Sequence, residues 1–569
     1  MHTPVKSVKP ATAKTVKADP AQKELAFIEL SGKVVDRVSP SPFGQNKALP
    51  LSKVLRAIKK LGELKNADTL LIQISDFKAS LETVWEIRNL LISIGKNEKK
   101  RIVVYADSYD LTSYLLGSAA HRIILNPAGE WSVTGLAMES MFMKDFLGSL
   151  GITADFLQMG KYKGAAENLT RTSMSPELKE SLGRLLDSLY QSFTTILATS
   201  RKIKEVDIKA LIDKAPLTAQ DAVAAHLVDD IQPFHLVFEQ YSKGKKIRKP
   251  KKKEAKKVSF LSLLSPPKTS TEVDVPHVAL ILADGSIMYG SEDPNDLFSG
   301  DSTIYSKSLV KAINKAADNE KAKAVVLRIN SPGGSALASE KIWQALHRCA
   351  TKKPLIVSMG SYAASGGYYI AAAAHEVFAS PFTITGSIGV VGGKMVLGGT
   401  LGKLKIRTEI LKRGNNAAWM STSSVFSETE RAAIKRTMEN VYRLFKDRVR
   451  QGRKKVKDVE SLAQGRIWSG ADAHGNHLVD TMGGLLDATH RARILGKLKG
   501  DDPVMIYPRP KPFMAAISEF FDKGTPLDEV SLSLFGNFLP QIHSLLVYKK
   551  LLKRERVLLT LPFVLRELY

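Results

Sequence analysis

Ser365 lies in the small-residue sequence Ala363-Ala-Ser-Gly-Gly367, within a long apolar stretch from Pro354 to Gly393. The apolar run and the glycines after it predict a buried strand over Leu355–Met359, a tight turn, and a helix from about Ala364. A hydroxyl at a strand-to-helix turn lies beside backbone N–H groups and in positive dipole potential. Such a position suits attack on a carbonyl group, although a turn required only for close packing uses the same residue types.

A serine hydroxyl is a poor nucleophile until a base takes its proton. Spacing identifies no His/Asp pair near Ser365, and His375 has the features of a structural histidine. Ser365 also lacks the G-x-S-x-G elbow, because Ala363 occupies the first glycine position. A lysine can be the base if burial lowers its pKa from about 10.4 to about 7 to 8. Local Ser-x-x-Lys patterns are too frequent in this chain to select one.

The chain is an internal duplication, and the comparison of its halves supplies a candidate for the base. Six blocks recur in one order at offsets between 251 and 255 residues. Such agreement over the whole length indicates two homologous domains. The matched blocks are Leu25–Gly32 with Val278–Gly285, Leu70–Ser80 with Val325–Ser335, Val103–Leu116 with Ile356–Tyr369, Ile124–Gly135 with Phe378–Gly389, Ser175–Phe193 with Ser427–Phe445, and His226–Asp229 with His477–Asp480.

Each half alternates short apolar strands with helical stretches, which predicts an α/β domain with a largely parallel sheet. Helix starts are marked by a capping box at Ser427–Glu430 and by Pro176 after Ser175. We expect a tail over 1–23, a first domain over 24–240, a linker over 241–274, a second domain over 275–500 and an extension over 501–569.

Positions at which the two halves differ indicate how function is divided. The second half has Ser331-Pro-Gly-Gly-Ser335, whose glycines let backbone N–H groups approach a ligand, where the first has Asp76-Phe-Lys-Ala-Ser80. It has Ser365-Gly-Gly against Thr112-Ser-Tyr114, and Thr385-Gly-Ser387 against Trp131-Ser-Val133. Only the first half has a lysine at Lys163, where the second has Ala417. This division predicts one composite site with a serine from the second domain and a lysine from the first.

Composition and charge limit which partners, disulfides and metal sites the chain can have. The 569 residues carry a formal net charge of +26, and ten Lys or Arg lie between Lys243 and Lys257 with Glu254 as the one acidic residue. This tract predicts a solvated linker, or adhesion to anionic phospholipid at about 1 kcal/mol per basic residue. It has no interleaved aromatic residues, so we expect no nucleic-acid partner. The single Cys349 excludes an internal disulfide and a cysteine-rich metal site.

The chain ends suggest no membrane anchor. Residues 1–23 are rich in Lys, Thr, Ala and Pro and resemble a disordered tail, not a signal peptide. Val557 to Leu565 is apolar but too short to span a bilayer. We expect a soluble or peripheral protein, or an anchor upstream of Met1.

At these residues the sequence resembles the signal peptide peptidase A family, long form, also called protease IV. The resemblance covers roughly residues 25 to 500. Its specific parts are Tyr162-Lys163 followed by Gly-Ala-Ala-Glu167, then Asn330-Ser-Pro-Gly-Gly-Ser335, Ala364-Ser365-Gly-Gly-Tyr368 and Thr385-Gly-Ser-Ile-Gly389.

The resemblance implies two tandem ClpP/crotonase-like domains that form a Ser/Lys-dyad peptidase, with no cofactor and no metal. Ser365 is implied as nucleophile, Lys163 as general base and Ser387 as the hydroxyl that orients the lysine. The backbone N–H groups of Gly333, Gly334 and Gly366 are implied as the oxyanion hole.

The implied substrates are cleaved signal peptides and other unfolded apolar segments, hydrolysed through an acyl-enzyme. The implied assembly is a homo-oligomer, typically a tetramer, with membrane association. Two alternatives remain: a crotonase-type acyl-CoA enzyme, which needs neither Ser365 nor Lys163, and a non-catalytic scaffold at the membrane surface.

Overall fold

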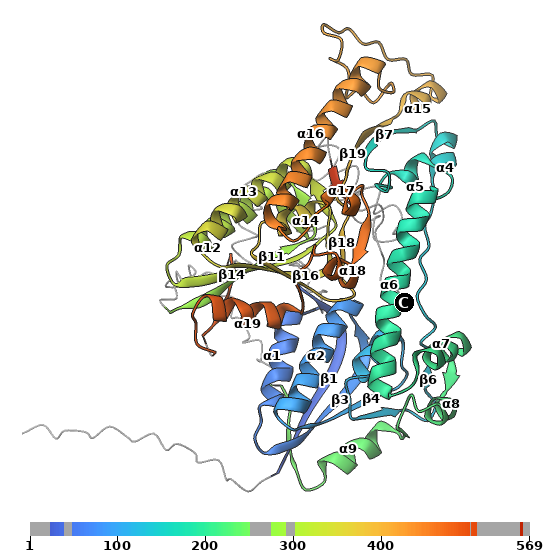
Figure 1. The fold of residues 1–569 in the computed structure, drawn as a ribbon. Helices are drawn as coiled ribbons and strands as arrows, with labels where there is room; N and C mark the ends of the chain where they lie inside the picture. Colours follow the sequence, from blue (N-terminus) through green and yellow to red (C-terminus); the bar gives the residue numbers. More distant parts are fainter. Residues whose placement is uncertain are drawn as a thin grey trace, which may run out of the picture.

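The computed structural model describes residues 23–38, 48–250, 275–291, 302–500, 502–508 and 558–560. Two largely parallel sheets with helices packed on them, one from each half of the chain, form the lower and upper parts of the molecule in Figure 1. This arrangement confirms the predicted α/β class and the predominance of parallel strands.

The first sheet has the strand order β10-β1-β3-β4-β5-β9, with β2 paired to β1, and every pairing in it is parallel. Helices α1, α2, α3 and α6 contribute to the large core on one face, and α9 packs on the other. The bounds are β1 Glu24–Val35, β2 Leu49–Pro50, β3 Ala67–Lys78, β4 Arg101–Ala106, β5 Arg122–Leu125, β9 Asp230–Ile231, β10 Lys246–Arg248, α1 Leu51–Gly62, α2 Leu81–Asn97, α3 Leu111–Gly117, α6 Pro176–Arg201 and α9 Phe234–Ser242.

The second sheet repeats this plan. Strands β22-β11-β14-β16 run parallel. The first part of β16 pairs in parallel with β17, which pairs with β21. The last part of β16 pairs in parallel with β18, which pairs antiparallel with β20. Helices α12, α13, α14 and α16 cover one face and α19 the other. The bounds are β11 His277–Asp284, β14 Ala322–Ser331, β16 Leu355–Ala364, β17 Glu376–Ala379, β18 Ile384–Gly386, β20 Ile467–Ser469, β21 Thr481–Met482, β22 Val504–Tyr507, α12 Ser306–Asp318, α13 Ala336–Lys352, α14 Gly366–Ala371, α16 Glu428–Gly452 and α19 Leu485–Leu495.

A third sheet joins the two halves. Its order is β13-β12-β15-β23-β19-β7, so the last pair brings β7 of the first half against β19 of the second. The short β23 lies antiparallel to both of its neighbours, β15 and β19. The bounds are β7 Thr153–Met159, β12 Ser286–Met288, β13 Thr303–Tyr305, β15 Gly333–Ser335, β19 Val390–Val396 and β23 Leu558–Thr560.

A buried ionic cluster also fixes the two halves. The guanidinium of Arg328, 1% exposed, donates to Asp36 Oδ1 at 3.0 Å, Glu82 Oε1 at 2.8 Å and Glu86 Oε1 at 2.5 Å. Glu86 also accepts the backbone N–H of Leu485 at the start of α19. Because Asp36, Glu82 and Glu86 belong to the first half and Arg328 to the second, loss of the guanidinium would leave three buried carboxylates without their cation, so the cluster ties the two halves together.

Local predictions from the sequence agree with the structure. The predicted strand and helix around Ser365 are β16 and α14. Ser427 and Glu430 form the predicted capping box of α16, and Ser175 accepts the N–H of Leu178 at the start of α6. Within the described ranges, no helix combines the length and the apolar character needed to cross a membrane.

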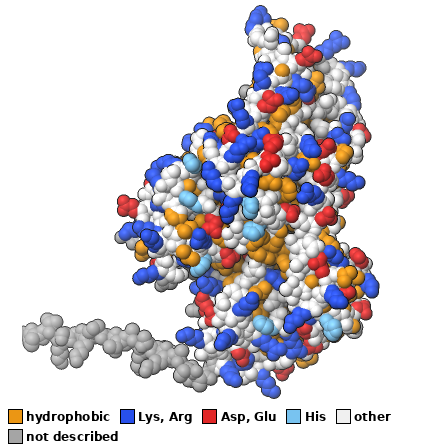
Figure 2. Space-filling model, in the orientation of Figure 1, with side chains coloured by type: hydrophobic (Ala, Val, Ile, Leu, Met, Phe, Trp, Pro, Cys, Tyr) orange, Lys and Arg blue, Asp and Glu red, His pale blue; other side chains and the backbone are white. Residues whose placement is uncertain are grey.

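The domain boundaries remain predictions, and two strands lie beyond them. β10 lies in the predicted linker and β22 in the predicted extension, and each adds a parallel strand beside β1 or β11. Within the basic tract, Lys245 pairs with Asp68 at 2.9 Å and Arg248 with Glu24 at 2.6 Å. Residues 1–22, 251–274 and most of 501–569 lie outside the described part. Lys and Arg side chains are spread over the whole face shown in Figure 2.

Candidate active site

Lys163, Ser365 and Ser387 meet in the interior where the two halves join. Lys163 Nζ lies 2.8 Å from Ser365 Oγ and 2.8 Å from Ser387 Oγ, and it donates to the Ser387 carbonyl at 3.0 Å. All three residues have no exposed surface. The structure thus places the Lys163 amine against two hydroxyls that lie more than 200 positions later in the chain.

Ser365 is held in a strained turn between β16 and α14. Its φ of +53° and ψ of −113° are unusual for a residue with a Cβ, and two bonds to its backbone fix this conformation. Ser365 N–H donates to the Gly386 carbonyl at 2.8 Å, and the Ser365 carbonyl accepts the N–H of Tyr369. Because both backbone groups are engaged, the Oγ position is determined by the turn.

Lys163 follows β7 and enters the site through a turn in which its N–H donates to the Gly160 carbonyl at 3.0 Å. The neighbouring Tyr162 N–H donates to the Gln464 carbonyl of the second half at 2.8 Å. Gly465 lies so close that a Cβ there would be 2.5 Å from the Lys163 nitrogen. The lysine is therefore clamped by residues of the opposite half.

Burial lowers the pKa of Lys163 well below the usual lysine value of 10.5. Loss of hydration is the cause, because water stabilises the charged ammonium more than this interior does. A neutral amine has a lone pair that can accept a proton from Ser365 Oγ. Among the described residues, no group of three or more His, Cys, Asp or Glu could hold a metal ion.

The glycines predicted to form an oxyanion hole lie beside Ser365. A Cβ on Gly366 would be 3.2 Å from both the Gly333 Cα and the Gly334 nitrogen, so the three glycines are in close contact. Gly333 N–H donates to Ser331 Oγ at 3.2 Å. Gly334 pairs with Ile287 of β12 on one side and with Leu559 of β23 on the other.

The structure corrects one detail of the comparison between halves. Tyr114 donates to the Leu227 carbonyl and Tyr368 donates to the Leu478 carbonyl, so these two tyrosines are counterparts. The alignment of the two halves must therefore be shifted by one residue in this block. After the shift Tyr114 no longer corresponds to a glycine of the second half, and Leu111 corresponds to Ser365. The structural role of His375 is confirmed, because its Nδ1 accepts the Leu355 N–H, as His121 Nδ1 accepts that of Ile102.

Sequence reasoning did not single out Gln464, Gly465 and Arg466. Arg466 accepts the Ser387 N–H on its carbonyl at 2.7 Å, and its guanidinium lies 4.1 Å from the centre of the Tyr162 ring. A signal was present in the duplication, because Lys214 is the first-half counterpart of Gly465 when the His226 and His477 blocks are aligned.

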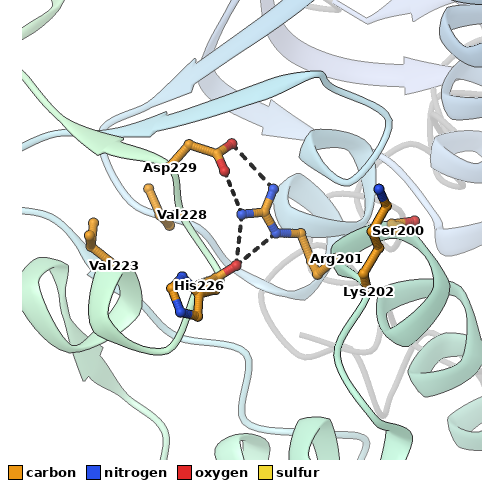
Figure 3. Close-up of a pocket in the computed structure, with 7 residues that line it drawn as sticks. All are labelled: Ser200, Arg201, Lys202, Val223, His226, Val228 and Asp229. Atoms are coloured by element: carbon orange, nitrogen blue, oxygen red, sulfur yellow. Dashed lines mark hydrogen bonds and ion pairs between the residues drawn. The ribbon is translucent and has the colours of Figure 1, made fainter.

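A surface hollow of about 630 Å³ lies elsewhere, between the end of α6 and residues 223–229 (Figure 3). Arg201 crosses it and binds Asp229 Oδ1 at 2.7 Å and the His226 carbonyl. In the second half Arg453 binds Asp480 and the Ala374 carbonyl. The arginine contact recurs in both halves, so we interpret it as structural.

Comparisons with known proteins agree with this arrangement. The model of peptidase family S49 matches residues 95–248 and 347–499, and the Clp protease model matches residues 299–386. The chain is 32% identical to the chloroplastic serine protease SPPA of Arabidopsis thaliana over 74% of its length and 61% of the relative's. It is 32% identical to protease 4 of Haemophilus influenzae over 73% of its length and 68% of the relative's.

A solved structure of a ClpP1 mutant from Listeria monocytogenes covers 37% of this chain and 94% of its own, with 14% identity and a TM-score of 0.23. The duplicated sheets and the family matches define a serine peptidase built from two ClpP/crotonase-like α/β domains. The chain belongs to peptidase family S49.

Proposed function

We propose that this peptidase is a Ser/Lys-dyad endopeptidase that cleaves released signal peptides and other unfolded apolar segments. The observation that carries the proposal is the fully buried Lys163 amine at 2.8 Å from Ser365 Oγ. Burial lowers the pKa of Lys163 well below its usual value, and no carboxylate is among the causes of the shift, which supports a lysine that acts as a base in its neutral form.

In this mechanism, Lys163 Nζ takes the proton of Ser365 Oγ as the oxygen attacks the peptide carbonyl carbon. The carbonyl oxygen becomes an oxyanion that N–H groups of Gly366 and the Gly333-Gly334 turn stabilise, at roughly 3 to 4 kcal/mol per donor. Lys163 then protonates the leaving nitrogen, the C–N bond breaks and an ester with Ser365 remains. A water molecule gives its proton to Lys163, attacks the ester and releases the acid, and the proton returns to Ser365. Ser387 orients Nζ throughout.

A peptide substrate is supported by the path of β23. This extended segment of the chain pairs antiparallel with Gly333–Ser335 and with Val391, beside Ser365. The buried Leu558 side chain packs among Ala165, Ala166 and Val391. The same edge offers an extended apolar peptide backbone pairing and an apolar side-chain pocket.

We further propose a homo-oligomer, as the family resemblance implies with a tetramer, and association with an anionic membrane surface. Deletion of residues 243–257 tests the membrane contact, since unchanged binding to anionic vesicles would remove it.

The test of the dyad compares hydrolysis of an unfolded apolar peptide by wild type, Ser365→Ala and Lys163→Ala. We expect each variant to lose at least about 10³-fold in kcat. Lys161→Ala is the matched control, because Lys161 is an exposed lysine two positions away and should retain activity.

The pH profile of kcat/KM is the second readout. The wild-type rate should rise with pH through an apparent pKa below 10.5, since protonation of Lys163 removes the base. Near wild-type turnover in either dyad variant, or a plateau already complete at pH 5, would refute the assignment. Cleavage of an acyl-CoA thioester with intact activity in Ser365→Ala would instead favour the crotonase-type alternative.

A further inference from the structure

Strand β16 bulges shortly before it reaches Ser365. Its parallel pairing with β14 is regular up to Met359 and resumes at Ala363. The residues between them, Gly360–Tyr362, face Asn330 alone on β14. Bulges occur next to active sites, where they re-aim a side chain. The path of this bulge therefore determines where the strand delivers Ser365.

The duplication shows that the second half has one additional residue in this stretch. Ala106 and Met359 are counterparts 253 positions apart, since each pairs with the matching isoleucine of the neighbouring strand. Tyr114 and Tyr368 are counterparts 254 positions apart. In the first half, β3 pairs with β4 up to Ala106 without a register shift. The additional residue thus lies between Met359 and Tyr368, in the stretch that holds the bulge and Ser365.

Asn330 bonds to the bulge through its side chain. Its Oδ1 accepts the Tyr362 N–H at 3.2 Å, and its Nδ2 donates to Asp284 Oδ1 at 2.9 Å. Because a backbone N–H can only donate and a carboxylate can only accept, these two partners fix the orientation of the amide. Asn330 also directly precedes Ser331, where the glycine turn begins. One side chain therefore links β11, the bulge of β16 and the start of that turn.

The first half does not have this pair. The aligned blocks place Ser31 at the position of Asp284 and Ser75 at the position of Asn330. A shared fold keeps the side chains that packing requires, whereas this Asp–Asn pair occurs in the half that also has the glycine turn and Ser365. The asymmetry therefore points to a role in the site.

The first half also packs against the bulge. Ser361 Oγ donates to Ser80 Oγ at 2.8 Å. A Cβ on Gly360 would lie 2.9 Å from Asp36 Oδ2 and 3.2 Å from Asn330 Cβ. The bulge is thus enclosed between Asn330 on one side and the first half on the other, and the loss of one support shifts it toward the other.

We propose that Asn330, held by Asp284, is a positioning residue that fixes both the bulge before Ser365 and the glycine turn. It acts through the backbone of these two elements and sets the position of Ser365 Oγ relative to the N–H groups of the oxyanion hole. The inference rests on the proposed role of Ser365 as nucleophile. Its loss should lower kcat with little change in KM, because the attacking oxygen is displaced while the binding edge remains.

An exchange of the two side chains tests the proposal. In Asn330→Asp two carboxylates face each other and must share a proton, so the pair holds at low pH and opens as pH rises. We expect the ratio of variant to wild-type kcat to fall at least tenfold between about pH 6 and about pH 10, with KM changed less than about threefold. Adding Asp284→Asn restores a donor opposite the carboxylate and should return kcat to within about threefold of wild type throughout.

The charged groups that act on Asp284 are Asp36 and Arg37, which follow β1, and Arg328 of β14 binds Asp36. They are the same in wild type and in each variant, so the ratio of kcat values reports the new carboxylate pair.

The matched control is Asn126→Asp in the first half. Asn126 has the same bonding pattern, because its Nδ2 donates to Asp107 Oδ1 and its Oδ1 accepts the Ala128 N–H, both at 3.0 Å. This variant also creates two facing carboxylates, but it should keep the wild-type kcat over the same pH range.

Three results would overturn the proposal: equal pH dependence of kcat in Asn330→Asp and Asn126→Asp, a change confined to KM, or a folded exchanged protein that stays inactive. If Asn330→Asp does not fold, the exchanged protein alone decides, and wild-type kcat supports the proposal. Ser365→Ala separates this inference from the proposed function. Wild-type turnover in Ser365→Ala would remove both, whereas an inactive Ser365→Ala beside a fully active Asn330→Asp at about pH 10 would remove the positioning role alone.

Discussion

Ser387 has the same kind of backbone strain as Ser365, with φ at +51°. Glycine adopts this conformation freely, so Ser387→Gly relieves strain while it removes the hydroxyl that lies 2.8 Å from Lys163 Nζ. We predict a 10- to 100-fold fall in kcat, because one of the contacts that orient the amine is lost, with unchanged or increased thermal stability (an order-of-magnitude range).

The matched control for this variant is Lys202→Gly, at a φ of +57° at the end of α6, far from the dyad. It should gain stability and keep full activity. If Ser387→Gly instead keeps wild-type kcat, or loses activity only in proportion to a loss of folded protein, Ser387 does not orient the lysine.

Asp284 gives a residue-scale prediction about how folding stability depends on pH. Burial, followed by the nearby Asp36 carboxylate, raises the pKa of Asp284 to about 6 from its usual 3.8. The native state therefore holds this proton more tightly than the unfolded chain, so stability is lost as pH rises through about 6. Asp284→Asn should be more stable than wild type by about 2 to 3 kcal/mol at pH 8 and equal to it near pH 3.

Denaturant unfolding at several pH values measures this difference. Asp318→Asn is the control with the opposite sign, because hydrogen bonds from Lys352 and Arg348 lower the pKa of the exposed Asp318. That variant should lose stability, or change little, at pH 8. A destabilised Asp284→Asn at pH 8 would show that the carboxylate form is favoured in the folded protein.

At the scale of elements, the turn at Gln464–Arg466 decides where Lys163 lies. Gly465 has φ at +81°, and a Cβ on it would meet three atoms of Lys163 within 2.7 Å. We predict that Gly465→Ala displaces the amine and lowers kcat by about 10²-fold or more. Gly183→Ala is the control, since Gly183 lies in α6 with open space around it and should gain roughly 0.5 to 1 kcal/mol.

Peptide hydrolysis and thermal unfolding of both alanine variants give the readouts. An active Gly465→Ala protein would mean that the turn can shift without moving Nζ, and that the clamp is not required for the geometry of the dyad.

The duplication made much of this element-scale picture predictable. Aligned halves identify strands, helix caps and the asymmetric positions Lys163 and Ser365, because a shared fold keeps what packing requires. The short strands β10, β22 and β23 were not predicted. Strands of three or four residues carry little periodicity, and their pairing depends on distant partners such as β1, β11 and β15.

The register error at Tyr114 has a similar physical cause. A one-residue shift in a short block leaves sequence similarity nearly unchanged. The hydrogen bonds of Tyr114 and Tyr368 to the Leu227 and Leu478 carbonyls reveal it. The roles of Gly465 and Arg466 were likewise hidden, since they arise from contacts across the two halves.

At the scale of the whole molecule, the proposed active site depends on how the two domains meet. Arg328 and its three carboxylates fix one part of the interface, and β7 with β19 fixes another. Lys163 lies four residues after the end of β7 at Met159, and Ser387 lies three residues before the start of β19 at Val390. The strand pair that joins the domains therefore also sets the distance between the amine and its two hydroxyls.

The same sheet holds β23 where an extended substrate would pair, so this segment should compete with peptides. Leu558 has no exposed surface and packs beside Val391, and its replacement weakens the docking of the strand. We predict that Leu558→Ala raises kcat/KM for a short apolar peptide several-fold. Leu197→Ala, an equally buried leucine of α6, controls for lost packing alone and should bring no increase. A fall in kcat/KM for folded Leu558→Ala protein would mean that β23 supports the site and does not occlude it.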